Sequence, residues 1–592
     1  MSMYQVPQRD ISLILDEIVN YDTLCKLSGF EDASRDVVDA VLVEAAKFFE
    51  TIVAPTNHTA DGQGTQLKGG TVQTAAALDG VYDQMVESGW CCLNGDSDYG
   101  GAGLPSVVDL ATQEMLQSAN TALSLLPMLS RGVIHALSLY GSDEQKKTYL
   151  EKLIAGTWTG TMNLTESQAG TDLSAVQTKA TPHGDHYLIQ GQKIYITWGD
   201  HELADNIIHL VLARIVGAPG GNNGISLFLV PKYLVNADGS LGARNDVAVV
   251  GVEHKLGIHA SPTCTMAFGD KGGAVGYLVG PENRGLMCMF AMMNNARLAV
   301  GHQGVAVGER AYQQAVAYAS DRVQGRIEGH DTNAPIIHHP DVKRMLMQMR
   351  ALVEGGRALS FFAIAAEDRS RRNSDLACRE RDACWVEILT PLVKGWCTEV
   401  SMEVASLGVQ VHGGMGFIEE TGAAQHMRDA RILPIYEGTN GIQGLDFLGR
   451  KCLRDGGEGL SSLIVAMQET VAELSNSASS LTLLVASLER AIRQCKEALD
   501  QVLSHPDDAP AIAYNCLLLY GNALCYWLLV RLAAAAQRKI DDGSTDRFYT
   551  NKIATARFFA TQILPRNDGL LRSLGDGATC LESMSGVDFA RT

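Results

Sequence analysis

The chain has 592 residues, a formal net charge of −19 at pH 7 and a pI of about 5.2. This length exceeds what one hydrophobic core supports, so several domains are expected. The acidic balance disfavours binding to nucleic acid or to an anionic membrane surface, because both require clustered cations. The 13 cysteines are scattered without Cys-x-x-Cys spacing, which favours reduced thiols over a disulfide framework or a zinc site.

The N-terminal segment lacks the features of a targeting sequence. It carries Asp10 and Asp16 and has no basic region followed by an apolar run, so no signal or transit peptide is expected. The most apolar long segment spans residues 511–536, but Asn522 and Arg531 interrupt it. A buried bundle helix is therefore expected there rather than a membrane span, and the protein is predicted to be cytoplasmic.

The first 160 residues are predicted to be mainly helical. In segment 36–50, apolar residues recur at spacings of three and four, as on one face of an amphipathic helix. The glycine-rich segments 61–70 and 100–105 are predicted loops. The Gly-x-Gly in the second loop is not framed by a strand and a helix, so it is not interpreted as a dinucleotide-binding fingerprint.

Residues 161–285 change to short apolar runs separated by glycine, proline and asparagine, a pattern typical of strands. No helical pattern separates these runs, so an antiparallel sheet or barrel is expected rather than a parallel sheet. The predicted strands are 187–197, 207–213, 225–230, 247–252 and 263–268.

Helical periodicity returns after residue 285 and continues through the last region of the chain. That last region contains two predicted long helices, 460–503 and 511–536, joined through segment 505–510. The chain is therefore predicted to be mainly α with a central β domain. The predicted domains are an N-terminal helical domain (1–160), a central β domain (161–285), a helical bundle (286–450) and a C-terminal helical extension (451–592).

Segment 435–443 carries one carboxylate, Glu437, among uncharged residues. Removing such a carboxylate from water raises its pKa, which suits a general base working near neutral pH. Gly438 and Gly441 let the backbone approach a ligand closely. Taken alone, a glutamate beside a glycine is more often a surface loop residue than a catalyst, so this interpretation depends on the other motifs.

Four segments, in order along the chain, resemble motifs of the acyl-CoA dehydrogenase family. Thr-Glu-Ser-Gln-Ala-Gly-Thr-Asp at 165–172 resembles the first flavin and substrate motif, and Gly-Gln-Lys-Ile-Tyr-Ile-Thr at 191–197 resembles the strand that meets the flavin. Gln-Val-His-Gly-Gly-Met-Gly-Phe at 410–417 resembles the turn on the pyrophosphate side, and Tyr-Glu-Gly-Thr at 436–439 is similar to the catalytic base motif.

The resemblance covers about residues 40–450 and implies the family's architecture of a helical bundle, a β-barrel or sheet domain and a second helical bundle. The extra C-terminal helical domain is similar to that of larger members, including the 3-methylmercaptopropionyl-CoA dehydrogenase type. The family's cofactor is FAD, which fits a chain without a Walker A sequence or a Rossmann fingerprint.

The resemblance assigns one set of residues to the flavin. Leu164 and Thr165 would meet the pyrimidine side, and Thr197 would donate a hydrogen bond near flavin N5. Tyr195 would lie against the ring system, at a position where the family often has Trp. The same site would be completed by Thr439 and Gln443.

A second set is assigned to the FAD of a partner subunit, because the family binds this cofactor across a subunit interface. Arginine suits its pyrophosphate because the planar donors bind bidentately. From the residue alone, Arg322 could equally form a solvated ion pair with Asp321. The residues of this set are Arg322, Gln324, Gln410 and Gly414.

The resemblance assigns a third set to the substrate. Arg297 matches the arginine near the substrate end of the third domain. Some family members place their base beside this arginine, where this chain has Ala296, so the base is assigned to Glu437. Thr171 and Ser167 stand where the family usually has Ser and Pro, and the Thr171 hydroxyl can still bond an acyl-CoA. The implied substrate-binding residues are Thr171, Asn294, Arg297 and Gly438.

The implied reaction is α,β-dehydrogenation of an acyl-CoA, either a fatty acyl-CoA or 3-methylmercaptopropionyl-CoA. Glu437 would remove a Cα proton, and a hydride would pass from Cβ to flavin N5, giving a trans-2-enoyl-CoA. The backbone N–H of the base and a ribityl hydroxyl would polarise the thioester carbonyl. An electron-transfer flavoprotein is the implied acceptor. A homodimer is expected, with the C-terminal extension covering the surface that smaller relatives use to form tetramers.

Two alternative functions remain open from the sequence. An acyl-CoA oxidase shares the fold, size and base but passes its electrons to O₂. A non-catalytic, DNA-associated flavoprotein also carries an extra helical domain, but residues 451–592 contain 14 Lys and Arg against 16 Asp and Glu, which disfavours DNA. His330, His338 and His339 invite a metal interpretation, but no carboxylate pattern accompanies them, so no metal site is expected.

Overall fold

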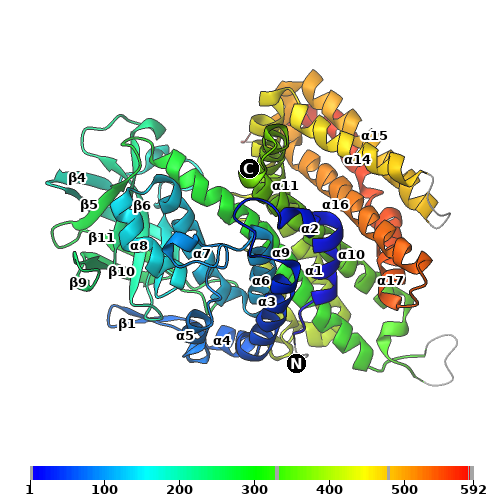
Figure 1. Cartoon of the computed structure of the whole chain (residues 1–592), viewed down its shortest axis with the longest axis horizontal. Helices are drawn as coiled ribbons and strands as arrows, with labels where there is room; N and C mark the ends of the chain where they lie inside the picture. The colour runs from blue at the N-terminus through cyan, green and yellow to red at the C-terminus, as the bar shows by residue number, and fades with distance from the viewer. Residues whose placement is uncertain (1–3, 327–332, 476–480, 585, 587–592) are drawn as a thin grey trace. The chain divides into compact units, whose positions relative to one another are not determined.

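The computed structural model of the protein describes residues 4–326, 333–475, 481–584 and 586 (Figure 1). The chain divides into two compact units. One unit comprises Glu44–Ala296, and the other combines Met1–Val43 with Arg297–Thr592. Helices hold 64% of the residues, which confirms the prediction of a mainly α chain. The four domain boundaries expected from the sequence stay a prediction.

Helices with clear start signals precede the sheet of the unit Glu44–Ala296. Asn120 begins α7 by accepting a hydrogen bond from the Leu123 N–H (3.0 Å). Ser142 and Gln145 form a capping box at the start of α8, and Gly156, with φ of 83°, ends that helix. The three helices are α6 (Ser106–Ala119), α7 (Thr121–Tyr140) and α8 (Asp143–Ala155).

A short helix and a hairpin occupy part of a segment that was predicted to be a loop. The two glycines of the hairpin turn, Gly69 and Gly70, have φ of 60° and 79°. Two consecutive residues with positive φ suit a two-residue hairpin turn. The loop prediction for 61–70 was therefore partly wrong, because its paired glycines close a hairpin. The elements are α4 (Asn57–Gln63), β1 (Gln66–Lys68) and β2 (Thr71–Gln73).

The main sheet has eight strands in the order β10-β11-β5-β12-β7-β6-β3, with β4 paired to both β5 and β6. Its pairs are antiparallel except β3 with β6 and β4 with β6. The predicted strands are observed as β5 (His186–Thr197), β6 (Asn206–Ile215), β7 (Ile225–Pro231), β10 (Val247–Val252) and β11 (Thr263–Phe268). The prediction missed β3 (Trp158–Asn163), β4 (Lys179–His183), β12 (Ala274–Val279) and the separate hairpin of β8 (Tyr233–Val235) and β9 (Leu241–Arg244).

Alternate residues of the central strands face two different apolar cores. On β6, Leu210 and Leu212 belong to one cluster with residues of α7 and α8, whereas Val211 and Ala213 belong to a second cluster with residues of β5 and β11. This period of two is the geometry of a strand. Because both faces are covered, β6 and β7 are apolar along almost their whole length.

The other unit is built from long helices. The longest, α9 (Gly285–Asp321) and α11 (Leu376–His412), have 37 residues each, and α10 packs along α11. The first 43 residues also belong to this unit and carry α1 (Gln8–Ile14), α2 (Tyr21–Leu24) and the predicted helix observed as α3 (Arg35–Phe48), which continues beyond residue 43. The remaining helices are α10 (Pro340–Arg372), α12 (Ala423–Ala430), α13 (Asn440–Leu445), α14 (Glu458–Leu474), α15 (Thr482–Ser504), α16 (Ala509–Asp541), α17 (Arg547–Phe558) and α18 (Arg566–Glu582).

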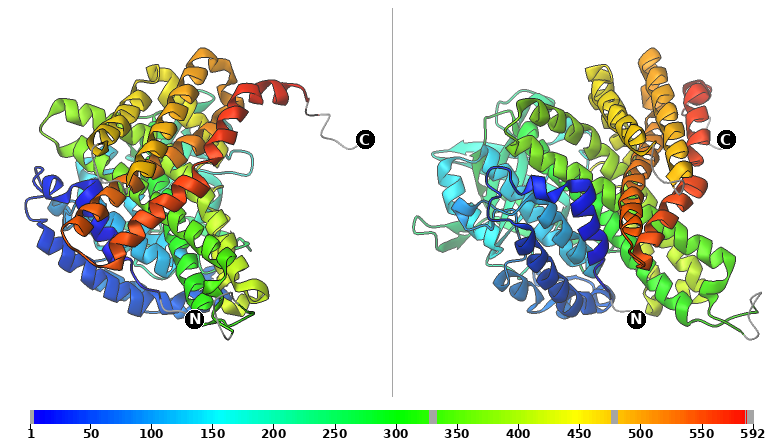
Figure 2. Two further views of the ribbon diagram at one scale, coloured as in Figure 1. Left: turned by 90° about the vertical axis from the view of Figure 1, so that its right-hand side faces the viewer. Right: turned by 45° about the vertical axis from the view of Figure 1, so that its right-hand side comes forward.

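The helix predicted over 460–503 is in fact two helices. In the described residues α14 ends at Leu474, α15 begins at Thr482, and the two helices pack side by side (Figure 2). The apolar periodicity runs on both sides of the polar segment 475–480, most of which lies outside the described residues, so the pattern alone suggested one continuous helix. The second predicted long helix is confirmed as α16.

α16 is the core helix of its unit. It contacts α10, α11, α13, α15, α17 and α18, and 89% of its most apolar window is buried. The polar residue that interrupts it is internally paired, because Asn522 accepts from Trp396 Nε1 (2.9 Å) and donates to Asn567 Oδ1 (2.9 Å). The other helix long and apolar enough to span a membrane, α7, is 83% buried over its window. Both are therefore core helices.

The N-terminal segment is tied to the last helices by charge pairs. Asp10 forms an ion pair with the buried Lys552 of α17, and Arg9 pairs with Asp546 (2.5 Å). Glu17 pairs with Arg538 of α16 at 2.5 Å. The two ends of the chain therefore contribute to one compact unit.

The first prediction concerns Gly521 of α16, whose backbone lies close to the Trp396 ring. An added Cβ at Gly521 would lie 2.2 Å from the Trp396 ring. We expect Gly521→Ala to lower the free energy of unfolding by about 1–3 kcal/mol, because a packed core cannot absorb an extra methyl group there. Chemical denaturation followed by circular dichroism measures this. The matched control is Gly569→Ala on α18, where a Cβ meets nothing within 4 Å and a neutral or stabilising effect is expected. Equal stability of the two variants would contradict this packing.

Candidate active site

The loop that carries Glu437 has an unusual backbone. Glu437 has φ of 56° and Gly438 has φ of 89°, two consecutive left-handed residues directly before α13. A non-glycine residue in this region is strained by roughly 1–3 kcal/mol and persists only where its surroundings hold it. Thr439 then caps α13, since its hydroxyl accepts from the Ile442 N–H (3.4 Å).

Side chains from three elements hold this loop. The Glu437 carbonyl accepts from Arg297 Nε of α9 (3.4 Å) and from Gln443 Nε2 of α13 (3.1 Å). The Gly438 carbonyl accepts from Gln443 Nε2 (3.2 Å) and from Lys394 Nζ of α11 (2.6 Å). Both carbonyls after the candidate base are therefore fixed, which accounts for how the strained conformation is kept.

The electrostatics of the loop favour a base. Burial raises the pKa of Glu437, although the nearby charges of Arg297 and Lys394 partly oppose this shift. Arg297 is itself buried and pairs with Asp446 (3.3 Å). A carboxylate whose pKa lies above its usual range accepts a proton more readily at neutral pH than an ordinary surface glutamate does.

Gln443 offers the fit test for a cofactor in this unit. Its side chain is fully buried, and its Oε1 has no hydrogen-bond partner among the described residues. A buried amide oxygen without a partner is costly, so a bound molecule that donates to it would remove the penalty. The residue was assigned to the flavin from the sequence, and its unpaired oxygen fits that role.

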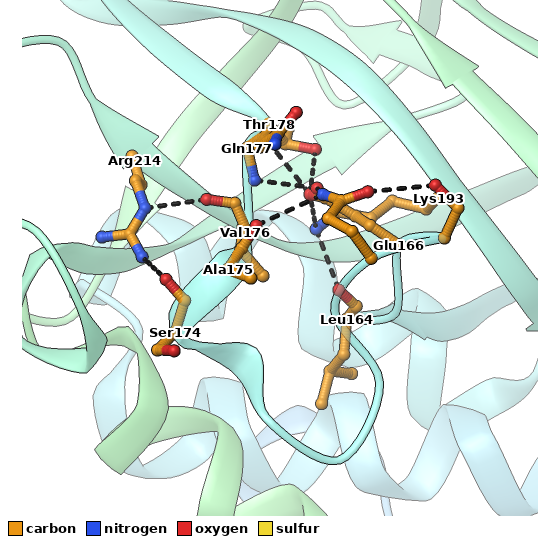
Figure 3. A network of polar contacts seen from close by, with 11 residues as sticks. Leu164, Glu166, Ser174, Ala175, Val176, Gln177, Thr178, Lys193 and Arg214 are labelled. Atoms are coloured by element: carbon orange, nitrogen blue, oxygen red, sulfur yellow. Dashed lines mark hydrogen bonds and ion pairs between the residues drawn. The ribbon is translucent and has the colours of Figure 1, made fainter.

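In the unit Glu44–Ala296, a buried ion pair fastens the loop that carries Leu164 and Thr165 (Figure 3). Lys193 Nζ of β5 lies 2.8 Å from Glu166 Oε1 and also donates to the Leu164 carbonyl (3.0 Å). The Thr165 carbonyl accepts from the Ile194 N–H (2.9 Å). The loop is thus held against the strand on both sides of residue 165.

The charges of this ion pair are set by its surroundings. Burial opposes ionisation of Glu166, but the charge of Lys193 and hydrogen bonds from Thr178 and the Gln177 N–H lower the pKa of Glu166 to about 2. Burial lowers the pKa of Lys193 to about 8, with Glu166 opposing the shift. Both groups are therefore charged near pH 7. Arg214 extends the network by donating to the carbonyls of Ser174 (2.6 Å) and Val176 (2.8 Å), as Figure 3 shows.

A bulge directs Tyr195 out of the sheet. Ile196 pairs with Cys264 and Lys193 with Met266, so two residues of β5 lie opposite one residue of β11. Tyr195 has φ of 60° and its side chain is 61% exposed, an aromatic face open to a ring system. Thr197, two residues on, is half-buried, and its carbonyl accepts from the Thr161 hydroxyl (2.8 Å).

The residues assigned to a partner's FAD are all exposed in this chain. Arg322 and Gln324 follow the end of α9, while Gln410 and Gly414 flank the end of α11. Tyr318 of α9 stacks on His412 of α11, with ring centroids 4.4 Å apart, which holds the two helix ends together.

The sequence-predicted residues therefore fall into separate groups. The first group surrounds the loop of residues 437–439, which we call the base loop. It consists of Glu437, Gly438 and Thr439 of that loop, together with Gln443 of α13 and Arg297 of α9. The second group, Leu164 and Thr165, lies on the loop held by the Glu166–Lys193 ion pair, and Thr171 is exposed further along the same loop. Tyr195 and Thr197 lie on β5, and Asn294 is exposed on α9. Within the described ranges, no group of three or more His, Cys, Asp and Glu side chains could hold a metal, and His330 lies outside those ranges.

The comparisons with known families account for most of the chain. Residues 38–157 match "Acyl-CoA dehydrogenase, N-terminal domain", residues 161–270 match the middle domain, and residues 283–451 match the C-terminal domain. Residues 463–585 match "Acetyl-CoA dehydrogenase C-terminal like". Fold and site thus define an FAD-dependent oxidoreductase that acts on CH–CH bonds. The chain belongs to the acyl-CoA dehydrogenase family.

Individual relatives match over nearly the whole length. The chain is 46% identical over 568 residues to 3-methylmercaptopropionyl-CoA dehydrogenase of Ruegeria pomeroyi. This alignment covers 95% of this chain and 96% of the relative. It is 33% identical over 593 residues to a butyryl-CoA dehydrogenase of Syntrophomonas wolfei, covering 96% and 97%. The fold is similar to that of an acyl-CoA dehydrogenase from Bacillus anthracis, with a TM-score of 0.74 at 22% identity over 98% of this chain and 95% of that one.

Sequence reasoning missed the side chains that support these loops. Lys394 is fully buried in the apolar stretch of α11, and the Glu166–Lys193 pair joins residues 27 positions apart. A single lysine inside an apolar helical run was a visible signal for the first. For the second, the motif positions were recognised, but the pairing depends on the folded sheet.

We predict that the ion pair stabilises its unit in a pH-dependent way. Glu166→Gln should lower the free energy of unfolding by on the order of 3 kcal/mol at pH 7, because Lys193 is left buried without its partner. The pKa of Glu166 is lower in the folded chain than in the unfolded chain, so its contribution is present above about pH 4.5 and lost as the pH falls toward about 2.

Urea unfolding of parent and variant between pH 7 and about pH 3 measures this difference in the free energy of unfolding, which should narrow below about pH 4.5. The matched control is Glu151→Gln, an exposed glutamate of α8, for which little change is expected. If the free energy of unfolding differs between parent and Glu166→Gln by the same amount at every pH tested, the ionised pair is not the source of the difference.

Proposed function

We propose that this chain dehydrogenates 3-methylmercaptopropionyl-CoA or a short-chain fatty acyl-CoA, with Glu437 as the base that removes the Cα proton. The observation that carries this proposal is the base loop, in which burial raises the pKa of the Glu437 carboxylate while Arg297, Gln443 and Lys394 hold the backbone carbonyls of residues 437 and 438. The substrate is chosen because the 46% identical relative is named for 3-methylmercaptopropionyl-CoA and the 33% identical relative for butyryl-CoA.

The remaining site residues receive roles that their positions support. FAD, when bound, accepts the hydride. Tyr195 offers an exposed aromatic face, Thr197 a hydroxyl, and Gln443 an unpaired acceptor toward this cofactor. The carbonyls of Leu164 and Thr165 are bonded to β5, so these residues would present N–H groups and the Thr165 hydroxyl. Thr439 would complete the cofactor site, and substrate would be held by Thr171, Asn294, Arg297 and Gly438.

Thioester polarisation is assigned to the base loop itself. In the left-handed conformation of residues 437 and 438 the carbonyls turn toward Arg297, Gln443 and Lys394. The N–H of Glu437 would then donate to the thioester oxygen. Such a preorganised donor stabilises a developing enolate by several kcal/mol, in the manner of an oxyanion hole.

The proposed assembly is a cytoplasmic homodimer that passes electrons to an electron-transfer flavoprotein. It is supported by the exposed position of the residues assigned to the partner's cofactor, which leaves them accessible to a second copy of the chain. Large apolar side chains beside them are also exposed, which is typical of an interface. These are Val323 (47%), Met415 (49%), Phe417 (85%) and Ile418 (45%).

The domain division proposed for this enzyme is 1–160, 161–285, 286–450 and 451–592. The matched family ranges support breaks close to these positions, with one match ending at 157 and the next beginning at 161, and another ending at 451. In this division the third domain carries the base, and the fourth packs its core helix α16 against α10 and α11.

We expect Glu437→Gln to bind FAD and acyl-CoA but to slow flavin bleaching by roughly a hundredfold or more, because an amide cannot accept the Cα proton. Stopped-flow reduction with 3-methylmercaptopropionyl-CoA, butyryl-CoA and palmitoyl-CoA measures the rate and ranks the substrates. The matched control is Glu497→Gln, an exposed glutamate of α15, which should bleach as the parent does.

Three outcomes would revise the proposal. Near-parent bleaching of Glu437→Gln would remove the base assignment. Fastest reduction of the parent by palmitoyl-CoA would replace the short-chain substrate. Steady peroxide release without an added acceptor would identify an acyl-CoA oxidase.

A further expectation concerns the subunit interface. Arg322→Ala should retain FAD more weakly than the parent, because one charge-assisted contact to the pyrophosphate is lost. Cofactor content after gel filtration measures this, and Arg326→Ala in the same exposed segment is the matched control. Light scattering of the parent should give twice the chain mass of 63.6 kDa. A mass near four times that value, or unchanged FAD retention in Arg322→Ala, would contradict the assembly.

A further inference from the structure

Lys394 is a buried lysine whose side chain bonds the segment that follows Glu437. It lies on α11 with an exposed fraction of 0%. Burying an ammonium group is costly by several kcal/mol unless its donors and its charge are satisfied. The two acceptors of Lys394 Nζ are a backbone carbonyl and a side-chain amide oxygen, both of them neutral groups.

Its partners are instead on the base loop. Lys394 Nζ donates to the Gly438 carbonyl (2.6 Å) and to Asn440 Oδ1 (3.0 Å). The largest attraction on its charge comes from Glu437, which opposes the lowering of the Lys394 pKa to about 7 by burial. The loop segment therefore accepts two hydrogen bonds from this lysine and carries the charge that attracts it most.

Neighbours on α11 extend the same attachment. Asn440 Nδ2 donates to the Gly395 carbonyl (3.1 Å) and to Glu399 Oε2 (2.9 Å). The Thr398 hydroxyl donates to Asn440 Oδ1 (3.1 Å). The stretch of α11 from Lys394 to Glu399 thus holds both ends of the segment 438–440, which begins immediately after Glu437.

We propose that Lys394 is the positioning residue of the base: by holding the Gly438 carbonyl and Asn440 it keeps Glu437 in its left-handed backbone conformation and so directs the carboxylate. Arg297 and Gln443 bond the Glu437 carbonyl, and Lys394 and Gln443 bond the Gly438 carbonyl, with Lys394 making the shorter bond (2.6 Å against 3.2 Å). Loss of the lysine would leave the Gly438 carbonyl with only the longer bond from Gln443, so this peptide could rotate more easily. This inference rests on the proposed role of Glu437 as the base.

The test uses the FAD-loaded full chain. Lys394→Met removes the charge and the donors but keeps the length of the side chain. We expect flavin reduction to slow by roughly ten- to a hundredfold, because small displacements of a catalytic group have effects of this size, while the Kd of acyl-CoA changes little. We also expect faster amide hydrogen exchange in the peptide that spans residues 433–445. Lys394→Gln, which keeps one donor, should restore part of the rate.

The matched control is Lys552→Met, because Lys552 is equally buried (3% exposed) and lies in the same unit, bonded to Glu354 (3.0 Å) and Asp10. It should reduce stability without changing the reduction rate per folded enzyme or the exchange of residues 433–445. A normal reduction rate in Lys394→Met would overturn the proposal, as would a slower rate with unchanged exchange in the loop. Failure of both Lys394 variants to fold, with Lys552→Met folded, would assign the lysine to stability alone and also overturn it.

The outcome is distinguishable from a failure of the proposed function. If Glu437→Gln keeps its rate, the base assignment is lost whatever Lys394 does. If Glu437→Gln is inactive and Lys394→Met reduces flavin at the parent rate, only the positioning role is lost.

Discussion

The structure of the site depends on one constraint. A glutamate must stay partly desolvated while its backbone has a left-handed conformation that non-glycine residues rarely adopt. Burial raises the pKa of Glu437, and its φ of 56° adds strain. Neither condition is stable by itself. Both are kept because Arg297 and Lys394, on two different helices, direct their donors at the carbonyls of Glu437 and Gly438. The long helices of this unit therefore serve mainly to bring two buried cations to one short loop.

The same physical device recurs in the other unit with a different balance of charge. Lys193 is as deeply buried as Lys394 and also donates to a loop carbonyl, that of Leu164. It has a direct carboxylate partner in Glu166, so the pair is neutral as a whole and its role is to fasten the loop. The two hydrogen bonds of Lys394 Nζ go to neutral acceptors, and the largest attraction on its charge comes from Glu437. A buried lysine can thus fix a loop both when it pairs with a carboxylate, as Lys193 does, and when it bonds neutral acceptors, as Lys394 does. In the proposal above, Lys394 alone acts on the candidate base.

Much of this could be predicted from the sequence, and the failures have physical causes. Periodicity identified the strands around β5 to β7 and the core helix α16, because burial on one or both faces leaves a direct pattern. It failed at Gly69 and Gly70, whose paired positive φ angles close a hairpin, and at 460–503, where two helices of similar pattern follow each other. Motifs located Glu437, but the partner that holds its loop, Lys394, is 43 residues away and is recognisable only once α11 and the loop are packed together.

The ion pairs between the first residues and the last helices have a consequence for synthesis on the ribosome. Asp10 is made 542 residues before its partner Lys552, and Glu17 is made 521 residues before its partner Arg538. The segment Glu44–Ala296 is continuous and can fold while translation proceeds, whereas the unit that contains Glu437 cannot close until α16 and α17 have been made. The N-terminal helices pack on α10 and α16, so during synthesis they would have to wait for helices that follow the whole segment Glu44–Ala296.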